Sequence, residues 1–201
     1  MEKLPKILEE VVKNISDLPG LGPKSSLKIA LTFLKWPKEK VQKLVNSIIQ
    51  LKESLFLCDM CGNISDENPC SICKDPTRDD TQLCVVPDFD SFLVIEESGL
   101  FKGKFFVLSG LISAAEGTDV KDINIDRLKK RIRDGNVKEV ILALGTTKES
   151  EITESYITNI IKKEFPDIVV TRLAQGIPLG ITLKYVDPET LRQSFNFRQR
   201  L

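Results

Sequence analysis

Apolar side chains in the N-terminal part of the chain recur every three or four residues, which places them on one face of an α-helix. The pattern is interrupted by residues 18–25, Leu-Pro-Gly-Leu-Gly-Pro-Lys-Ser. Two glycines and two prolines this close together predict a tight turn, with Pro23 as the first residue of a new helix. The three predicted helices run over residues 4–18, 23–33 and 41–51.

Beyond residue 80 the pattern changes to short apolar runs that alternate with amphipathic segments. Alternating strands and helices are typical of a parallel α/β domain. A last short helix is predicted after Asp187, the expected N-cap, with Pro188 at its first position. The predicted strands are 83–86, 104–108, 137–144 and 168–173, and the predicted helices between them are 89–97, 125–134 and 152–165.

These patterns divide the chain into four predicted parts. Residues 1–57 form a helical module, and residues 58–79 form a segment that contains four of the five cysteines. Residues 80–174 form the α/β domain. We expect residues 175–201 to complete the α/β domain and to aid oligomerisation.

The four cysteines form two Cys-x-x-Cys pairs, Cys58/Cys61 and Cys70/Cys73. Each pair presents two thiolates toward one point, and Zn²⁺ prefers four such ligands in a tetrahedron. Gly62, directly after the first pair, lets the backbone curl around the metal with a positive φ. We therefore predict one structural zinc ion per chain. Two disulfides or a redox Cys-x-x-Cys motif are the alternatives, although redox motifs occur singly, at a strand-to-helix junction.

The composition excludes several classes of chemistry. The chain has no histidine, which excludes Ser-His-Asp and Cys-His nucleophile systems and catalytic zinc held by histidine. No apolar run approaches the length of a membrane span, and the N-terminus is amphipathic rather than a signal peptide. We therefore expect a cytoplasmic protein without membrane contact, in which the fifth cysteine, Cys84, packs in a strand.

The turn at residues 18–25 is a candidate DNA contact. Residues 1–57 carry ten lysines against six acidic residues, a net charge of +4, although the whole chain is neutral. In a helix-hairpin-helix module, glycines such as Gly20 and Gly22 let the backbone approach a phosphate, and free amides of the second helix point toward it. Lys24 and Lys28, one helical turn apart, add positive charge. The alternative is that the turn only connects two helices.

Two acidic residues, Glu149 and Glu151, follow the third predicted strand. In parallel α/β domains, function gathers at this carboxyl end of the strands. The two carboxylates can hold Mg²⁺ for phosphoryl chemistry, or they can favour the start of the next helix. A metal-dependent nucleic-acid enzyme needs a further carboxylate from a neighbouring strand, but the first strand is followed by Pro87 and only then by Asp88.

In this order, the hairpin, the four-cysteine site and the α/β domain resemble the RecR family of bacterial recombination mediators, whose α/β part is a Toprim domain. The resemblance covers nearly the whole chain. Its motifs are residues 18–25, the four cysteines, Arg78-Asp79, Leu83-Cys84-Val85-Val86, Glu149-x-Glu151, Thr171-Arg172-Leu173-Ala174, residues 176–180 (Gly-Ile-Pro-Leu-Gly) and Tyr185-Val186-Asp187.

The resemblance implies an α/β fold class with a helix-hairpin-helix module, a four-cysteine zinc finger, a Toprim-type parallel domain and a short C-terminal helical segment. It implies a non-catalytic protein of DNA repair that clamps DNA largely independently of sequence, as a dimer or tetramer. RecO and RecF are the implied partners, with which such a protein helps to load RecA onto DNA coated by single-strand-binding protein. Glu149 and Glu151 are the residues implied in binding RecO.

The chain also departs from the family pattern. Pro87 stands where Toprim domains usually have a glutamate, Ser150 separates two acids where the family prefers glycine, and Gly145-Thr146 replaces Asn-Pro. The missing carboxylate argues against metal-dependent cleavage.

The alternative function is a Mg-dependent Toprim nuclease, primase or topoisomerase-like enzyme. A topoisomerase needs a nucleophilic tyrosine, but Tyr156 falls in the middle of a predicted helix and Tyr185 in an apolar stretch, so we expect both to be packed. We therefore predict no catalytic residue.

Overall fold

The structure is a computed structural model that describes residues 4–198. The chain forms two compact units that divide between Leu55 and Phe56. Residues 1–3 and 199–201, the ends of the first and last predicted parts, lie outside the described residues. Within residues 4–198, no helix combines the length and apolar character that crossing a bilayer requires.

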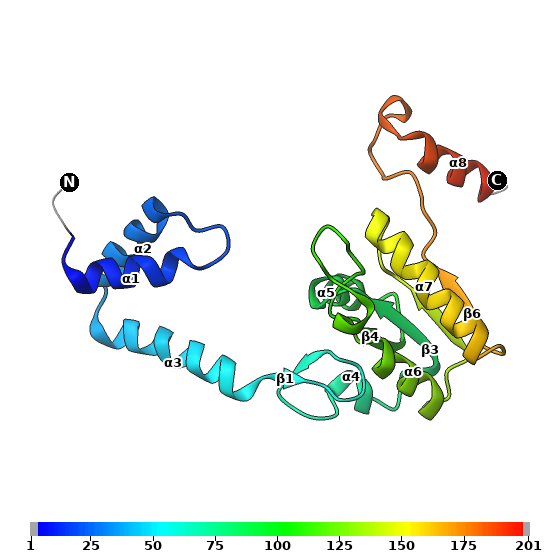
Figure 1. The fold of residues 1–201 in the computed structure, drawn as a ribbon, viewed down its shortest axis with the longest axis horizontal. Coiled ribbons are helices and arrows are strands. Elements are labelled where there is room, and N and C mark those ends of the chain that lie inside the picture. The colour runs from blue at the N-terminus through cyan, green and yellow to red at the C-terminus, as the bar shows by residue number, and fades with distance from the viewer. Residues whose placement is uncertain (1–3, 199–201) are drawn as a thin grey trace. The chain divides into compact units, whose positions relative to one another are not determined.

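The first unit consists of the three helices that the apolar spacing predicts. They are α1 (Lys6–Ser16), α2 (Pro23–Lys35) and α3 (Lys38–Ser54), and α1 packs against α2 (Figure 1). Pro23 is the first residue of α2, as predicted. The third helix is longer than predicted and begins directly after Pro37, because proline at a helix start loses no intrahelical hydrogen bond.

This unit buries few side chains. Among the described residues of the unit, only Ser26 and Ala30 are buried, both on α2. Large apolar side chains remain open to solvent, with Leu34, Ile48 and Leu51 exposed to 73%, 58% and 62%. Exposed apolar surface of this kind is typical of regions that contact another protein.

The second unit begins with the cysteine segment. Its strands β1 (Phe56–Leu57) and β2 (Ile64–Ser65) pair antiparallel in a short ribbon, and α4 (Ser71–Lys74) follows. These elements are too short to show a periodic apolar pattern, so only the cysteine spacing of this segment could be recognised in the sequence.

The main sheet has four parallel strands in the order β4-β3-β5-β6. This confirms the predicted parallel α/β domain. The first strand extends farther toward the N-terminus than predicted, because Asp79 pairs with Gly103 although its own side chain is exposed. The strands are β3 (Asp79–Val86), β4 (Gly103–Val107), β5 (Glu139–Leu142) and β6 (Val169–Arg172).

Helices cover both faces of this sheet. The helices α6 (Ile125–Asp134) and α7 (Lys148–Glu164) pack on one face, and α5 (Phe89–Ser98) packs on the other (Figure 1). Successive side chains of β3 alternate between the faces, so Leu83 joins the α6/α7 core and Cys84 joins the α5 core. Cys84 is therefore packed in a strand, as predicted, and burial raises the pKa of its thiol to about 12.

The start of α7 differs from the prediction. The helix begins at Lys148, four residues before the predicted start at Ile152, because the Thr147 hydroxyl accepts a hydrogen bond from the Ser150 amide at 3.2 Å. Glu149 and Glu151 consequently lie in the first helical turn rather than in a loop.

The C-terminal part follows β6. It contains irregular chain, the 3₁₀ turn η2 (Leu183–Tyr185) and then α8 (Pro188–Asn196). Asp187 is the N-cap of α8, as predicted, and accepts a hydrogen bond from the Thr190 amide at 2.9 Å. Another 3₁₀ turn, η1 (Val120–Asp122), precedes α6.

Candidate nucleic-acid interface and zinc centre

The hairpin turn between α1 and α2 has an open backbone. Gly20 has φ +77°, which L-residues with a side chain rarely adopt, and the Leu21 amide donates to the Leu18 carbonyl at 3.2 Å. Gly22 is the N-cap of α2 and provides no side chain to bond the free amides of the first helical turn. No atom lies within 4 Å of a Cβ built at either glycine, so the surface is accessible to a phosphate.

Two lysines accompany this turn. Lys24 and Lys28 are both exposed on α2, and their spacing of four residues places them on one side of the helix. The structure therefore places all four predicted DNA-binding residues at one helix N-terminus, with positive charge beside the open amides. Their role in binding DNA stays a prediction.

The four cysteines come together as one cluster. All four Sγ atoms lie within 4.8 Å of one another, with Cys61 and Cys70 3.6 Å apart and Cys58 and Cys73 4.0 Å apart. A tetrahedral zinc with Zn–S bonds of about 2.3 Å places neighbouring sulfurs about 3.8 Å apart. The cluster therefore fits a zinc ion with four thiolate ligands.

The backbone of the cysteine loop supports this arrangement. Gly62 has φ +74°, and its amide donates to the Cys58 carbonyl at 2.8 Å. The Cys58 amide in turn donates to the Asn63 carbonyl at 2.7 Å, and the Cys70 amide donates to the Cys58 sulfur at 3.3 Å. The turn predicted at Gly62 is thus present, and it closes the first cysteine pair.

Hydrogen bonding within the cluster shifts the pKa values of Cys70 and Cys61 in opposite directions. Hydrogen bonds from Cys61 and Cys73 lower the pKa of the Cys70 thiol, whereas hydrogen bonding to Cys70 and burial raise the pKa of Cys61. Zinc binds thiolates rather than thiols, so zinc binding and loss of the thiol protons are coupled.

Two acids at the carboxyl edge of the sheet, Asp88 and Glu149, are engaged at the starts of helices. Pro87 follows β3, and Asp88 is the N-cap of α5, where it accepts a hydrogen bond from the Ser91 amide at 2.8 Å. The backbone amide of Glu149 and the Thr147 hydroxyl hold the pKa of the Glu149 carboxyl below its usual range. The hydrogen bonds of Asp88 stabilise the start of α5, and those of Glu149 stabilise the start of α7. Both carboxylates therefore already have partners within the fold.

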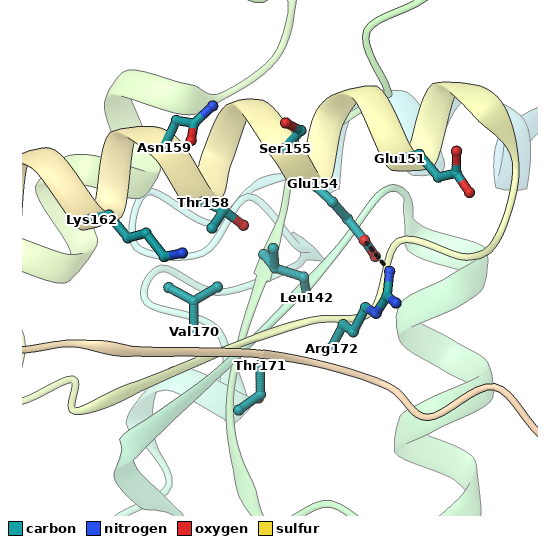
Figure 2. A pocket seen from close by; sticks show the side chains of 10 residues that line it. All are labelled: Leu142, Glu151, Glu154, Ser155, Thr158, Asn159, Lys162, Val170, Thr171 and Arg172. Carbon is teal, nitrogen blue, oxygen red and sulfur yellow. Dashed lines mark ion pairs between the residues drawn. The ribbon is translucent and has the colours of Figure 1, made fainter. Parts of the chain in front are cut away.

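A groove between α7 and β6 adds two charged residues for which the sequence predicts no role. Glu154 reaches from α7 toward Arg172 on β6, with 3.7 Å between the paired atoms, and Glu151 lies one turn earlier on the same helix (Figure 2). Burial raises the pKa of Glu154, while Arg172 opposes that shift. The groove has a volume of about 510 Å³. Thr171-Arg172 was recognised only as a family motif, and no pattern along α7 sets Glu154 apart.

The two tyrosines differ. Tyr156 is half-buried and packs against the core on the α6/α7 face, as predicted. The prediction for Tyr185 is wrong, because 69% of this side chain is exposed in the 3₁₀ turn η2. The apolar residues Ile181 and Leu183 before it are themselves exposed, so they provide no core for the ring.

Four protein families match consecutive segments of the chain, in the order that the structure shows. Residues 8–52 match the RecR helix-hairpin-helix family, 55–75 the RecR zinc finger domain with four cysteine ligands, 81–174 the Toprim domain and 176–199 the RecR C-terminal family. The recombination protein RecR of Maridesulfovibrio salexigens is 50% identical over 201 residues, which cover 100% of both chains. The chain belongs to the RecR family. The RecR proteins of Nitratidesulfovibrio vulgaris (47% identical, 100% of both chains) and Thermobifida fusca (39% identical, 96% of both chains) are also similar.

RecR membership confirms the resemblance, the fold class and the zinc cofactor. The RecR zinc-finger match covers all four clustered cysteines, which can bind one zinc ion.

The structure also explains one departure from the RecR pattern. Ser150, which stands where the resemblance leads us to expect a glycine, is buried, and its hydroxyl donates to the Leu144 carbonyl at 2.5 Å. This hydroxyl therefore ties the start of α7 to the end of β5.

Proposed function

We propose that this RecR-family chain is a non-catalytic DNA-binding mediator of recombinational repair that clamps DNA through its hairpin module. Acting with RecO and RecF, it helps to load RecA onto DNA coated by single-strand-binding protein. The observation that carries the proposal is the open turn at Gly20 and Gly22, which combines unobstructed helix-terminal amides with the exposed Lys24 and Lys28. The interaction with RecO and RecF rests on the family alone.

The hairpin suits phosphates rather than bases. Backbone amides and lysines bind phosphate oxygens, which carry no sequence information. Binding through such contacts releases counterions and weakens steeply as salt rises. We therefore expect DNA binding with little sequence preference.

The carboxyl edge of the sheet supports a function without catalysis. Pro87 cannot supply a carboxylate, and Asp88 is bound to the start of α5. Of the acidic positions that a metal-dependent Toprim enzyme uses, this chain therefore keeps only Glu149 and Glu151, which lie on one helical turn. We propose that they form part of the surface that binds RecO.

Self-association completes the proposal. The three helices of the first unit leave Leu34, Ile48 and Leu51 exposed, and the C-terminal part exposes Leu179 and Phe195 to 103% and 69%. Because the chain belongs to the RecR family, a second copy of the chain is the partner that we expect to cover these surfaces. We propose a dimer or tetramer that encloses DNA.

The central experiment changes the charge of the hairpin. We expect Lys24→Glu with Lys28→Glu to weaken binding to labelled duplex DNA, measured by fluorescence anisotropy at several salt concentrations. The loss of two phosphate contacts makes the negative slope of log affinity against log salt less steep, by about 1.8 per bound hairpin. Lys162→Glu with Lys163→Glu changes the net charge equally on exposed positions of α7 and serves as the control. Unchanged affinity in the hairpin variant would contradict the proposed contact.

A second experiment distinguishes the mediator from a Toprim enzyme. Purified protein is incubated with supercoiled and linear DNA in Mg²⁺, and cleavage, relaxation and primer synthesis are measured. We expect no turnover. Turnover that is abolished in Glu149→Ala would refute the proposal that the chain is non-catalytic.

A further inference from the structure

The cysteine loop is attached to the α/β domain by groups that lie far away in the sequence. The Val107 amide at the end of β4 donates to the Cys61 carbonyl at 2.7 Å. The Arg127 guanidinium on α6 donates to the Cys58 carbonyl, also at 2.7 Å. The zinc ligands therefore depend on the sheet and on α6 for their position.

Lys104 makes the most extensive of these contacts. It is a lysine on β4 with only 5% of its surface exposed. Its Nζ donates to three backbone carbonyls of the second cysteine pair and the following turn: those of Ile72 at 3.0 Å, Cys73 at 3.1 Å and Asp75 at 2.6 Å. An ammonium group has three N–H donors, so every donor of this buried cation is used.

A buried ammonium needs compensating negative charge. The three carbonyls satisfy its hydrogen bonds but carry no net charge, and the nearby Asp75 carboxylate, which also attracts Lys104, is paired with Arg78 at 3.6 Å. A zinc ion with four thiolates has a net charge of −2, and the Cys73 ligand belongs to the segment that Lys104 holds. Arg127, which is half-buried, holds the other cysteine pair through Cys58.

We propose that Lys104 and Arg127 are positioning residues of the zinc centre, each holding one Cys-x-x-Cys pair and together offsetting the charge of the zinc tetrathiolate. Neither residue is a zinc ligand. Groups that orient metal ligands from outside typically change metal affinity by about 10- to 100-fold. This role concerns zinc retention and does not depend on the proposed DNA contact.

The test measures zinc affinity in full-length protein by competition with a chromogenic chelator. Lys104→Met keeps the length and removes the charge, and Lys102→Met is the matched control because Lys102 is exposed beside the same strand. We expect Lys104→Met to bind zinc about 10- to 100-fold more weakly and Lys102→Met to bind within about twofold of the natural chain. Circular dichroism establishes that each variant is folded.

Arg127 provides an independent test, because its partly exposed side chain can be changed with little effect on the core. Arg127→Lys keeps the positive charge and Arg127→Met removes it. Arg133→Met is the control, because Arg133 is exposed on the same helix and lies over the Phe165 ring rather than at the cysteine loop. We expect Arg127→Met to lose about tenfold in zinc affinity and Arg127→Lys to recover most of that loss. The absorption bands of the Co²⁺-substituted protein, which report thiolate geometry, should shift in Arg127→Met and not in Arg133→Met.

Two results would overturn the proposal. The first is zinc affinity and Co²⁺ spectra in folded Lys104→Met and Arg127→Met that match the two control variants. The second is an equal loss in Arg127→Lys and Arg127→Met, which would remove the role of charge. If Lys104→Met does not fold, the Arg127 series alone decides between these outcomes.

Discussion

Gly62→Ala tests how closely the cysteine loop packs on the sheet. A Cβ at this position would lie 2.8 Å from the backbone carbonyl oxygen of Val107, a distance that side chains essentially never show. Because the contact is with backbone at the end of β4, no flexible side chain can move away. The loop would have to shift away from β4, together with the hydrogen bond from the Val107 amide to Cys61.

The cost has two parts. The left-handed φ of +74° costs alanine about 1–2 kcal/mol, and the close contact adds about 1–3 kcal/mol, as overpacking in a well-packed site does. Gly99→Ala isolates the second part, because Gly99 has a similar φ of +66° in the same unit and no atom within 4 Å of its Cβ. The gain from a less flexible unfolded chain applies to both variants and cancels in the comparison. Gly62→Ala should therefore be less stable than Gly99→Ala by about 1–3 kcal/mol.

Urea unfolding followed by far-ultraviolet circular dichroism measures this difference in zinc-loaded protein. The single tryptophan, Trp36, lies in the first unit, so its fluorescence provides a reference signal away from the substitution. If the two variants lost the same stability to within about 0.5 kcal/mol, the close packing of the loop on β4 would be refuted.

Two further predictions concern the start of α7. Ser150→Ala should destabilise the fold by about 1–3 kcal/mol in urea unfolding, because it leaves the buried Leu144 carbonyl without its partner, whereas Ser155→Ala on the exposed side of α7 should change little. The Glu149 carboxylate accepts hydrogen bonds from its own amide and from Thr147, which lower its pKa below the ordinary value of 4.5. Because the pKa of Glu149 is lower in the folded state than in the unfolded state, its ionisation stabilises the fold when the pH is above the ordinary pKa. This stabilisation is lost as the pH falls through the lowered pKa. The free energy of unfolding, measured across that pH range, should therefore depend less on pH in Glu149→Gln than in the natural chain. The same pH dependence in both proteins would contradict the hydrogen bonding of this carboxylate.

The spacing of apolar residues, together with the capping and proline residues at helix starts, predicted most of the fold. Pro23 marked the start of α2, Asp187 with Pro188 marked the start of α8, and the apolar runs located all four strands of the sheet. These features are local, because a helix start or a buried strand is encoded by a few neighbouring residues. The start of α7 was missed because Thr147, its cap, is one of several polar residues in a row.

The zinc ligands could be predicted, but the residues that hold them could not. Cysteine spacing is a local pattern, whereas Lys104 is a charged residue at the beginning of an apolar strand and resembles an ordinary strand end. Its burial depends on how β4 meets α4, a contact between segments distant in sequence. Tyr185 was misplaced for the opposite reason, since apolar neighbours along the chain suggested a core that the fold does not form there.

The distance in sequence between the zinc ligands and their supports sets an order of events during protein synthesis. Lys104 lies 31 residues after Cys73, and Arg127 lies 69 residues after Cys58. At about 5–20 residues per second, Lys104 is added about 2–6 s after the last zinc ligand. In that interval all four thiols are already made while the strand that shelters them is not. Early capture of zinc would then protect the growing chain from thiol oxidation before the sheet exists.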